Sequence, residues 1–241
     1  MMKSRLNGIQ YLINGFKLIQ QPGLKRYALI PLLINMILFA GLFMYSRHVF
    51  GELSLWLLAL LPAWLQWIGS ILWVLFFIGF FFLMIYTFVT LANLIAAPFN
   101  SLLAEKVEYH LTGVERDNQT FLQAVQDTPR IVLRQLALLG YYLPRAAVLI
   151  ILFFIPVVQL IAPILWFLFH AWLMTLQYVD YPTDNQRIAI KDVQMKLNKK
   201  RVLCYTFGSG VMILSMIPIV NFFVMPAAVA GATRMWIEEL A

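Results

Sequence analysis

The sequence predicts an all-α integral membrane protein, and its composition and uncharged runs carry that prediction. Of the 241 residues, 62% are apolar and only 12% are charged. A soluble domain is typically about half apolar and about one quarter charged, so a soluble fold could not bury this excess. Four runs carry no charge, and each is long enough for a membrane-spanning helix of about 20 residues. They are residues 27–46, 53–104, 146–179 and 202–233.

Residues 1–22 are expected to form an amphipathic helix at the membrane interface. Their apolar side chains recur at spacings of three and four, and polar side chains lie largely on the other side. The apolar positions are Leu6, Ile9, Leu12, Ile13, Phe16 and Ile19. Pro22 and Gly23 end this helix, and a first transmembrane helix is predicted over residues 24–46. Pro31 falls in its second turn, where a missing backbone donor costs less than in mid-helix.

The middle of the chain predicts a second span and two segments of different character. Residues 53–68 are rich in Trp and contain Pro62, so they are predicted to form an interfacial segment. A second transmembrane helix is predicted over residues 70–98, with Pro98 as its stop. Residues 100–144 are mixed in polarity and are expected to form a cytoplasmic helical region.

The last two apolar regions, 146–179 and 202–237, resemble each other and flank a polar loop at 180–201. Each contains an Ile-Pro pair followed by a second proline seven or eight residues later, which divides an apolar run into halves. These prolines are Pro156 and Pro163 in the first region, and Pro218 and Pro226 in the second. In the first region, neither half comfortably spans about 30 Å of hydrocarbon. Both regions are therefore predicted to be re-entrant helical hairpins.

The distribution of positive charge supports this topology. If both hairpins return, the far side holds only residues 47–69, with one Lys or Arg against 17 on the near side. If both regions cross instead, the 180–201 loop changes sides with its six basic residues, and the split becomes 11 against seven. Because cytoplasmic loops are enriched in Lys and Arg, the returning hairpins are favoured. The prediction is one membrane domain, residues 1–241, with both termini in the cytoplasm.

The sequence carries no recognisable catalytic or metal-binding pattern, so neither an enzyme nor a cofactor is expected. FGSG at 207–210 lacks the Gly-Lys-Ser/Thr that completes a phosphate-binding loop. The single cysteine, Cys204, can form no intrachain disulfide, and the three histidines are scattered. Most basic residues flank apolar segments, which is typical of anchoring in lipid headgroups rather than of nucleic-acid binding.

The stretch PGLKR, residues 22–26, is the sharpest candidate for an anion site. Gly23 lets a ligand approach the backbone closely. The amides of Leu24, Lys25 and Arg26 open the first turn of the next helix, where the helix dipole favours negative charge. Arg26 also supplies a planar guanidinium that suits a tetrahedral oxyanion. The alternative is that Lys25 and Arg26 only anchor the helix end in headgroups.

Further polar residues are candidates for an anion path or its entrance. They are Arg130, Arg134, Arg145, Asn35, Asn93 and Glu105. Arg130 and Arg134 lie one turn apart on one helix face, and Asp127 precedes them as a possible neutralising partner. A solvated helix face is the alternative for this pair, and also for Glu105 together with Glu108. The two asparagines either bond between helices or face water within the membrane.

Seven stretches, in order along nearly the whole chain, carry a family resemblance. They are QPGLKR with IPLLIN (21–35), ANLIAAPFNSLLAE (92–105), DTPRIVLR (127–134), YYLPRA (141–146), APILWFLFHAW (162–172), QYVDYPTDN (177–185) and IPIVNFFVMPAAVAGAT (217–233). QYVDYPTDN and APFNSLLAE are too particular to arise from membrane composition alone. The sequence resembles the CysZ family of bacterial sulfate-uptake membrane proteins, within the broader EI24-like family.

The resemblance implies a multi-pass protein of the bacterial inner membrane that takes up sulfate for cysteine biosynthesis without ATP hydrolysis. It implies two long transmembrane helices, two hemi-penetrating hairpins and a homo-oligomer. It also implies a sulfate site at a Gly-Leu-x-Arg turn, here Gly23, Leu24 and Arg26, while Lys25 takes a position that can be Arg in relatives. A broader channel for sulfite or other oxyanions, and a scaffold that regulates or assembles other proteins, remain as alternatives.

Overall fold

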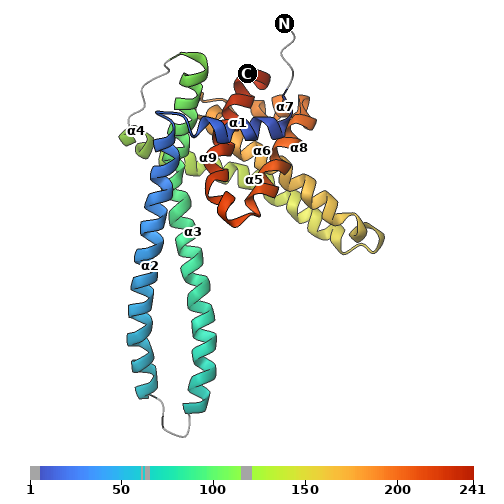
Figure 1. Ribbon diagram of the computed structural model, residues 1–241. Helices are drawn as coiled ribbons and strands as arrows, with labels where there is room; N and C mark the ends of the chain where they lie inside the picture. Colours follow the sequence, from blue (N-terminus) through green and yellow to red (C-terminus); the bar gives the residue numbers. More distant parts are fainter. Residues whose placement is uncertain (1–5, 61, 63–65, 115–120) are drawn as a thin grey trace. The chain divides into compact units, whose positions relative to one another are not determined.

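A computed structural model describes residues 6–60, 62, 66–114 and 121–241, and all regular elements in these ranges are helical. The helices are α1 (Gly8–Leu18), α2 (Lys25–Leu60), α3 (Gln66–Thr112), α4 (Phe121–Gln126), α5 (Thr128–Phe153), η2 (Val157–Leu160), α6 (Ala162–Asn185), α7 (Ile190–Lys199), α8 (Arg201–Ser215), α9 (Pro218–Met235) and η3 (Trp236–Leu240) (Figure 1). Helices α2, α5, α6 and α9 with its continuation are long and apolar enough to cross a membrane. The all-α membrane fold class is confirmed.

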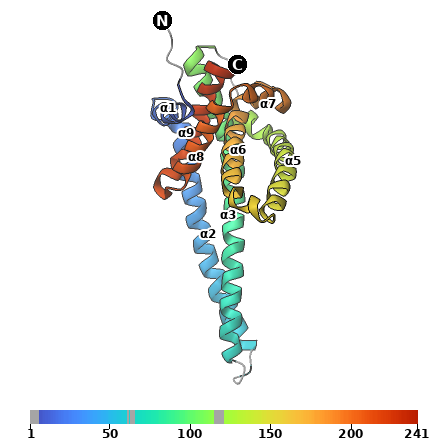
Figure 2. The ribbon, with the colours of Figure 1, turned by 90° about the vertical axis from the view of Figure 1, so that its right-hand side faces the viewer.

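Contacts divide the predicted membrane domain into two compact units, and one of them is Ile30–Ala96. It contains most of α2 and the first part of α3, which lie side by side in Figures 1 and 2. The rings of Phe39 and Phe88 meet edge to face with centroids 5.2 Å apart. The predicted spans at 24–46 and 70–98 fall in these two helices, except that α2 begins at Lys25 and not at Leu24.

Both helices are longer than the sequence predicted, for reasons of local packing and propensity. Residues 53–60 continue α2 and residues 66–68 begin α3, so the predicted interfacial segment is not a separate element in the described residues. Pro98 does not stop α3, which runs on to Thr112. Phe99 and Leu103 beyond the proline are buried in the core, and this packing offsets the one backbone hydrogen bond that Pro98 removes.

The second unit comprises Met1–Leu29 and Ala97–Ala241, and its core lies where α1, α6, α8 and α9 pack together. Two glycines allow the helix backbones to approach closely. A Cβ on Gly208 of α8 would overlap the carbonyl oxygen of Ala171 in α6. A Cβ on Gly15 of α1 would overlap the carbonyl oxygen of Ala227 in α9. Small residues at such crossings replace side-chain bulk with extensive backbone contact.

Helix α1 is shorter than the predicted amphipathic segment at 1–22 and begins with a capping box. The side chain of Asn7 accepts a hydrogen bond from the Gln10 amide at 2.8 Å, and the Gln10 side chain accepts one from the Asn7 amide at 2.8 Å. The apolar side of α1 is divided between two environments. Leu12 is fully buried in the core, whereas Ile9 and Ile13 are exposed.

Two helical hairpins follow, α5 with α6 and α8 with α9, as Figure 1 shows. The predicted boundary between residues 100–144 and 146–179 falls inside α5, which runs unbroken through Pro144 and Arg145, so it is not an element boundary and stays a prediction about the membrane surface. Helices α5 and α6 have 26 and 24 residues, or about 39 and 36 Å at 1.5 Å per residue, so both continue beyond the uncharged run at 146–179.

The prolines of the two hairpins differ in where they lie relative to the helices. Pro156 lies in the turn between α5 and α6, and Pro163 lies in the first turn of α6, where a proline is tolerated. Pro218 likewise begins α9, but Pro226 lies inside α9 without breaking it. The predicted polar loop at 180–201 is largely helical, because α6 extends to Asn185 and α7 follows it.

We expect the glycine crossings to decide the stability of this unit. Gly208→Ala and Gly15→Ala should each destabilise the protein by about 1–3 kcal/mol or more, because the added methyl group meets backbone atoms that cannot rotate away. Gly140→Ala is the matched control, since Gly140 is an exposed helical glycine with no atom within 4 Å of an added Cβ. Thermal unfolding in detergent measures the difference. Equal unfolding midpoints for all three variants would contradict this account of the core.

Candidate functional site

The PGLKR turn joins α1 to α2 and presents its cations to the outside. Gly23 has φ +90°, a conformation that L side chains rarely adopt, and no other residue comes within 4 Å of a Cβ built on it. Leu24 is 3% exposed and anchors the turn in the core. Lys25 and Arg26 are exposed in the first turn of α2. The predicted close approach of a ligand to the backbone at Gly23 is therefore sterically open.

The backbone amides of this turn differ from the sequence-based expectation. The amides of Leu24 and Lys25 both donate to the carbonyl oxygen of Gln21, at 3.2 and 3.1 Å, so these two are not free. Within the described part of the chain, the amides of Gly23 and Arg26 have no acceptor. Bifurcated sharing of one carbonyl is common at helix ends and leaves two donors beside the exposed guanidinium.

The guanidinium of Arg26 is held by its neighbour Tyr27. One of its nitrogens, Nη2, donates to the Tyr27 hydroxyl at 3.1 Å, and the group lies 4.9 Å from the centre of the Tyr27 ring. This contact restrains the side chain while the other guanidinium donors stay available. Lys25 also lines an apolar cavity of about 330 Å³ between the ends of α1, α2 and α9. Apolar walls exclude water and so strengthen the field of a nearby cation.

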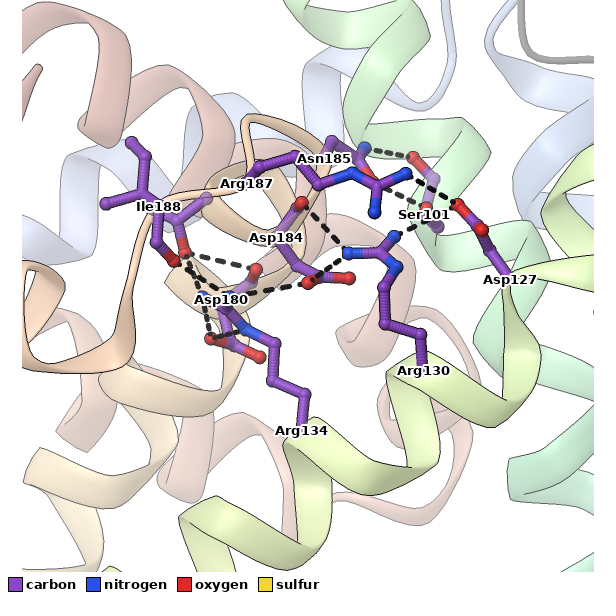
Figure 3. A network of polar contacts seen from close by, with 10 residues as sticks. Ser101, Asp127, Arg130, Arg134, Asp180, Asp184, Asn185, Arg187 and Ile188 are labelled. Atoms are coloured by element: carbon purple, nitrogen blue, oxygen red, sulfur yellow. Dashed lines mark hydrogen bonds and ion pairs between the residues drawn. The ribbon is translucent and has the colours of Figure 1, made fainter.

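Arg130 and Arg134 lie in a second polar cluster, in which aspartates offset their charges (Figure 3). Arg134 donates to Asp180 at 2.9 Å and to the carbonyl oxygen of Ile188 at 2.8 Å. Arg130 pairs with Asp184 at 2.6 Å and with Asp127 at 3.1 Å. The expectation that Asp127 neutralises one of the two arginines is confirmed, and the alternative of a solvated face does not hold, because both side chains are partly buried.

The cluster extends to α3 through amide and hydroxyl groups. Ser101 donates to the side chain of Asn185 at 2.6 Å, and Asn185 donates back to the Ser101 carbonyl oxygen at 2.8 Å. Asn100 donates to the Tyr181 hydroxyl at 3.3 Å. The motifs APFNSLLAE and QYVDYPTDN therefore meet here. Both motifs are particular in the sequence, but the pairing of Asp180 and Asp184 in QYVDYPTDN with the arginines was not predicted.

Other candidate residues lie apart from the turn and the cluster. The guanidinium of exposed Arg145 stacks on the Tyr141 ring, 3.6 Å from its centre. Glu105 and Glu108 are only 9% and 6% exposed, so the expectation that they form a solvated surface is wrong. Glu105 accepts a charge-assisted hydrogen bond from Lys106 at 3.1 Å.

The two asparagines of the transmembrane segments belong to the other unit. The side-chain oxygen of Asn35 is buried and has no hydrogen-bond partner among the described residues. The side chain of Asn93 lies outside what the structure describes. Their predicted place on a polar path therefore stays a prediction. Among the described residues, no His, Cys, Asp or Glu side chains gather in a group of three that could hold a metal ion.

Charge balance separates the two groups of arginines. The cluster contains three aspartates, which form ion pairs with three arginines, so its net positive potential is small. The aspartates are Asp127, Asp180 and Asp184, and the arginines are Arg130, Arg134 and Arg187. At the turn, Lys25 and Arg26 have no carboxylate partner within the described residues. A mobile anion is therefore attracted more strongly to the turn than to the cluster.

The fold and these sites define a multi-pass α-helical membrane protein with an unpaired basic turn before its first long apolar helix. The chain belongs to the family described as Sulfate transporter CysZ/Etoposide-induced protein 2.4, which its sequence matches over residues 11–226. The match covers the turn, the polar cluster, the hairpin of α5 and α6, and the hairpin of α8 and α9 as far as Pro226. The family resemblance noted from seven sequence stretches is thus confirmed, and membership indicates a transporter-like function.

The arginine–aspartate cluster should contribute strongly to stability. Arg134→Met leaves Asp180 and Asp184, with side chains 5% and 8% exposed, short of a buried partner. We expect a loss of about 3–5 kcal/mol, the usual cost of removing one member of a buried ion pair. The unfolding midpoint of the purified protein measures this loss, and Arg134→Met combined with Asp180→Leu should recover part of it.

Arg187→Gln is the control for the loss of positive charge. Arg187 is 64% exposed and lies 3.6 Å from Asp127, so its removal should change stability by no more than about 0.5 kcal/mol. If Arg134→Met and Arg187→Gln unfold at the same temperature, the cluster does not hold the helices together.

Proposed function

We propose that this protein carries sulfate across a bacterial inner membrane and so supplies cysteine biosynthesis. The observation that carries the proposal is the PGLKR turn, in a chain of the CysZ family. It combines a positive-φ glycine, two amides without acceptors, and an exposed guanidinium at the start of a 36-residue helix. These are the groups that bind a tetrahedral anion at a helix N-terminus.

The chemistry of the turn suits a transported ion better than a permanently bound one. Amide and guanidinium donors replace part of the hydration shell of sulfate, and the open surface around Gly23 lets the ion leave again. Cations at a helix N-terminus oppose the helix dipole, so their presence there is favourable when an anion lies between. Sulfite and other oxyanions of similar charge fit the same donors, and the alternative of a broader anion channel follows from this.

Arg145, Asn35, Asn93 and Glu105 remain our candidates for the path beyond the turn, with Arg130 and Arg134 near its entrance. The offset charges of Arg130 and Arg134 support a role in shaping the path rather than in holding the ion. The hairpin turn at 154–161 is exposed in the single chain, with Val157 80% exposed. Irregular backbone at membrane depth needs cover from protein or water, which supports assembly into a homo-oligomer.

We also propose that both hairpins enter and leave the membrane by the same face. The uncharged part of α5 after Arg145 spans only residues 146–153, or about 12 Å, and α8 has 15 residues, or about 22 Å. Both lengths are below the roughly 30 Å of hydrocarbon, so a hairpin whose charged end stays at the interface cannot reach the far side.

Cysteine labelling at the hairpin tip tests this topology. Gln159→Cys should react with no membrane-impermeant maleimide from either side, and should react once the protein is denatured and the thiol can ionise. Lys191→Cys and Glu52→Cys are the controls for the two faces, and native Cys204 is buried and gives little background. If the impermeant reagent labels the Gln159→Cys variant from the side that labels Glu52→Cys, the hairpin crosses.

Substitutions in the turn should change sulfate affinity in a characteristic order. Arg26→Ala should weaken binding about 10- to 150-fold, because a hydrogen bond to a charged group contributes about 1.5–3 kcal/mol. Arg26→Lys should rescue only part of this, since an ammonium lacks the two-pronged geometry. Lys25→Ala should cost at most about fivefold, because only a solvated charge is lost. Equilibrium binding of sulfate in detergent measures all three.

Gly23→Ala tests the backbone without changing charge, and Gly113→Ala is its matched control. Both glycines have positive φ, +90° and +68°, and neither has an atom within 4 Å of an added Cβ. Both variants should therefore have a similar conformational cost, but only Gly23→Ala should bind sulfate less tightly.

Flux of labelled sulfate into liposomes that contain the purified protein should fall in the same order as sulfate affinity across these variants. No flux above empty liposomes would favour the scaffold alternative, and equal affinity for Arg26→Ala and the parent would end the proposal.

A further inference from the structure

A groove of about 780 Å³ lies between α5, α6 and the start of α8, and its two ends differ in polarity. One end is lined by Arg145, Asn198 and Arg201. The part nearer the turn between α5 and α6 includes the aliphatic side chains of Val148 and Leu165. The volume falls within the range of cavities that hold drug-sized organic ligands.

The polar end carries two arginines with no carboxylate to offset them. None of the lining residues is Asp or Glu, and within the described residues neither Arg145 nor Arg201 forms an ion pair. Arg145 is held in place by its stacking on Tyr141 and by donating to the Tyr141 carbonyl oxygen at 2.8 Å. Arg201 begins α8, where the helix dipole favours a negative charge and opposes a cation. An anion between the two guanidinium groups would relieve this opposition.

A buried donor lies along the same groove. The side chain of Trp172 lines it and is 7% exposed, and its indole N–H has no acceptor among the described residues. Buried Trp N–H groups usually find a hydrogen-bond partner. An oxygen of a ligand inserted beside Trp172 would supply one.

The apolar end leads toward the tip of the α5–α6 hairpin. Phe154, Val157 and Leu160 at this tip are 78%, 80% and 76% exposed. A surface of this kind is stable only in contact with lipid or protein. The groove follows α5 for about 12 Å from Tyr141 to Leu149, and beyond Arg145 its lining on this helix is aliphatic.

We propose that the groove binds an anionic phospholipid, with its phosphate between Arg145 and Arg201 and its acyl chains along Val148 and Leu165. A free inorganic anion would use the cationic end and leave the apolar end empty. A zwitterionic lipid brings its own cation next to the two arginines, and so gains less. The groove lies apart from the PGLKR turn but shares Arg145 with the proposed anion path, so lipid binding is measured in the absence of sulfate.

Binding of defined lipids to the delipidated protein tests this proposal. Native mass spectrometry with phosphatidylglycerol and phosphatidylcholine of equal chain length should show tighter binding of phosphatidylglycerol. Arg145→Gln and Arg201→Gln should each weaken that binding about tenfold, as expected for one hydrogen bond to a charged group. Lys199→Gln is the matched control, because Lys199 is exposed, lies two residues from Arg201 and does not line the groove. It should bind phosphatidylglycerol as the parent does.

Val148→Trp separates a lipid site from a site for free phosphate. It fills the apolar end without changing charge, so it should weaken phosphatidylglycerol binding and leave any binding of inorganic phosphate unchanged. The unfolding midpoint without lipid shows that each variant is folded. Equal binding of the two lipids by the parent, parent-like binding by both arginine variants, or displacement of the lipid by equimolar inorganic phosphate would each overturn the proposal.

Discussion

The close approach of helix backbones at Gly15 and Gly208 is the constraint on which the larger unit depends. Lipid tails are as apolar as Leu, so apolar burial between helices adds little in a membrane, and tight packing must supply the cohesion. The glycines allow α1 to lie against Ala227 of α9, and α8 against Ala171 of α6. Because α1 and α9 are far apart in the sequence, this contact places the start of α2 beside the C-terminal hairpin. That packing therefore fixes the position of the PGLKR turn.

The second constraint is the balance of charge within the same unit. Asp127, Asp180 and Asp184 offset the guanidinium groups of the polar cluster, so its arginines chiefly join α5 to α6. Buried charges without partners would be costly, and pairing avoids that cost. Among the described residues, Lys25 and Arg26 at the turn and Arg145 and Arg201 in the groove between α5, α6 and α8 have no carboxylate partner. Basic residues that look alike in the sequence therefore have different roles: those paired with aspartates join helices, and those without a carboxylate partner are available to bind an anion.

The surroundings of these unpaired cations favour different anionic ligands. Lys25 and Arg26 begin an apolar helix beside an open glycine, where a small hydrated anion can reach the backbone. Arg145 and Arg201 border a groove whose far end is aliphatic, and an amphiphilic anion matches that gradient. The guanidinium group therefore suits two classes of ligand, a small hydrated anion and an anionic lipid. The shape and polarity of the adjoining surface decide which of the two it binds.

The sequence by itself determined the membrane class, the helical content, the two long helices of the middle of the chain and the break between the first two helices at Gly23. Each follows from local properties, namely uncharged runs of sufficient length, or a backbone that only glycine adopts easily. The sequence did not determine where helices end: Pro98 was predicted to stop α3, but packing of the residues beyond it keeps the helix intact to Thr112. Nor did it show that Arg134 reaches Asp180, or that Glu105 is buried, since these depend on residues brought together from distant segments. Tertiary structure alone decided which charges are paired, because a charge is offset by whatever lies near it in space.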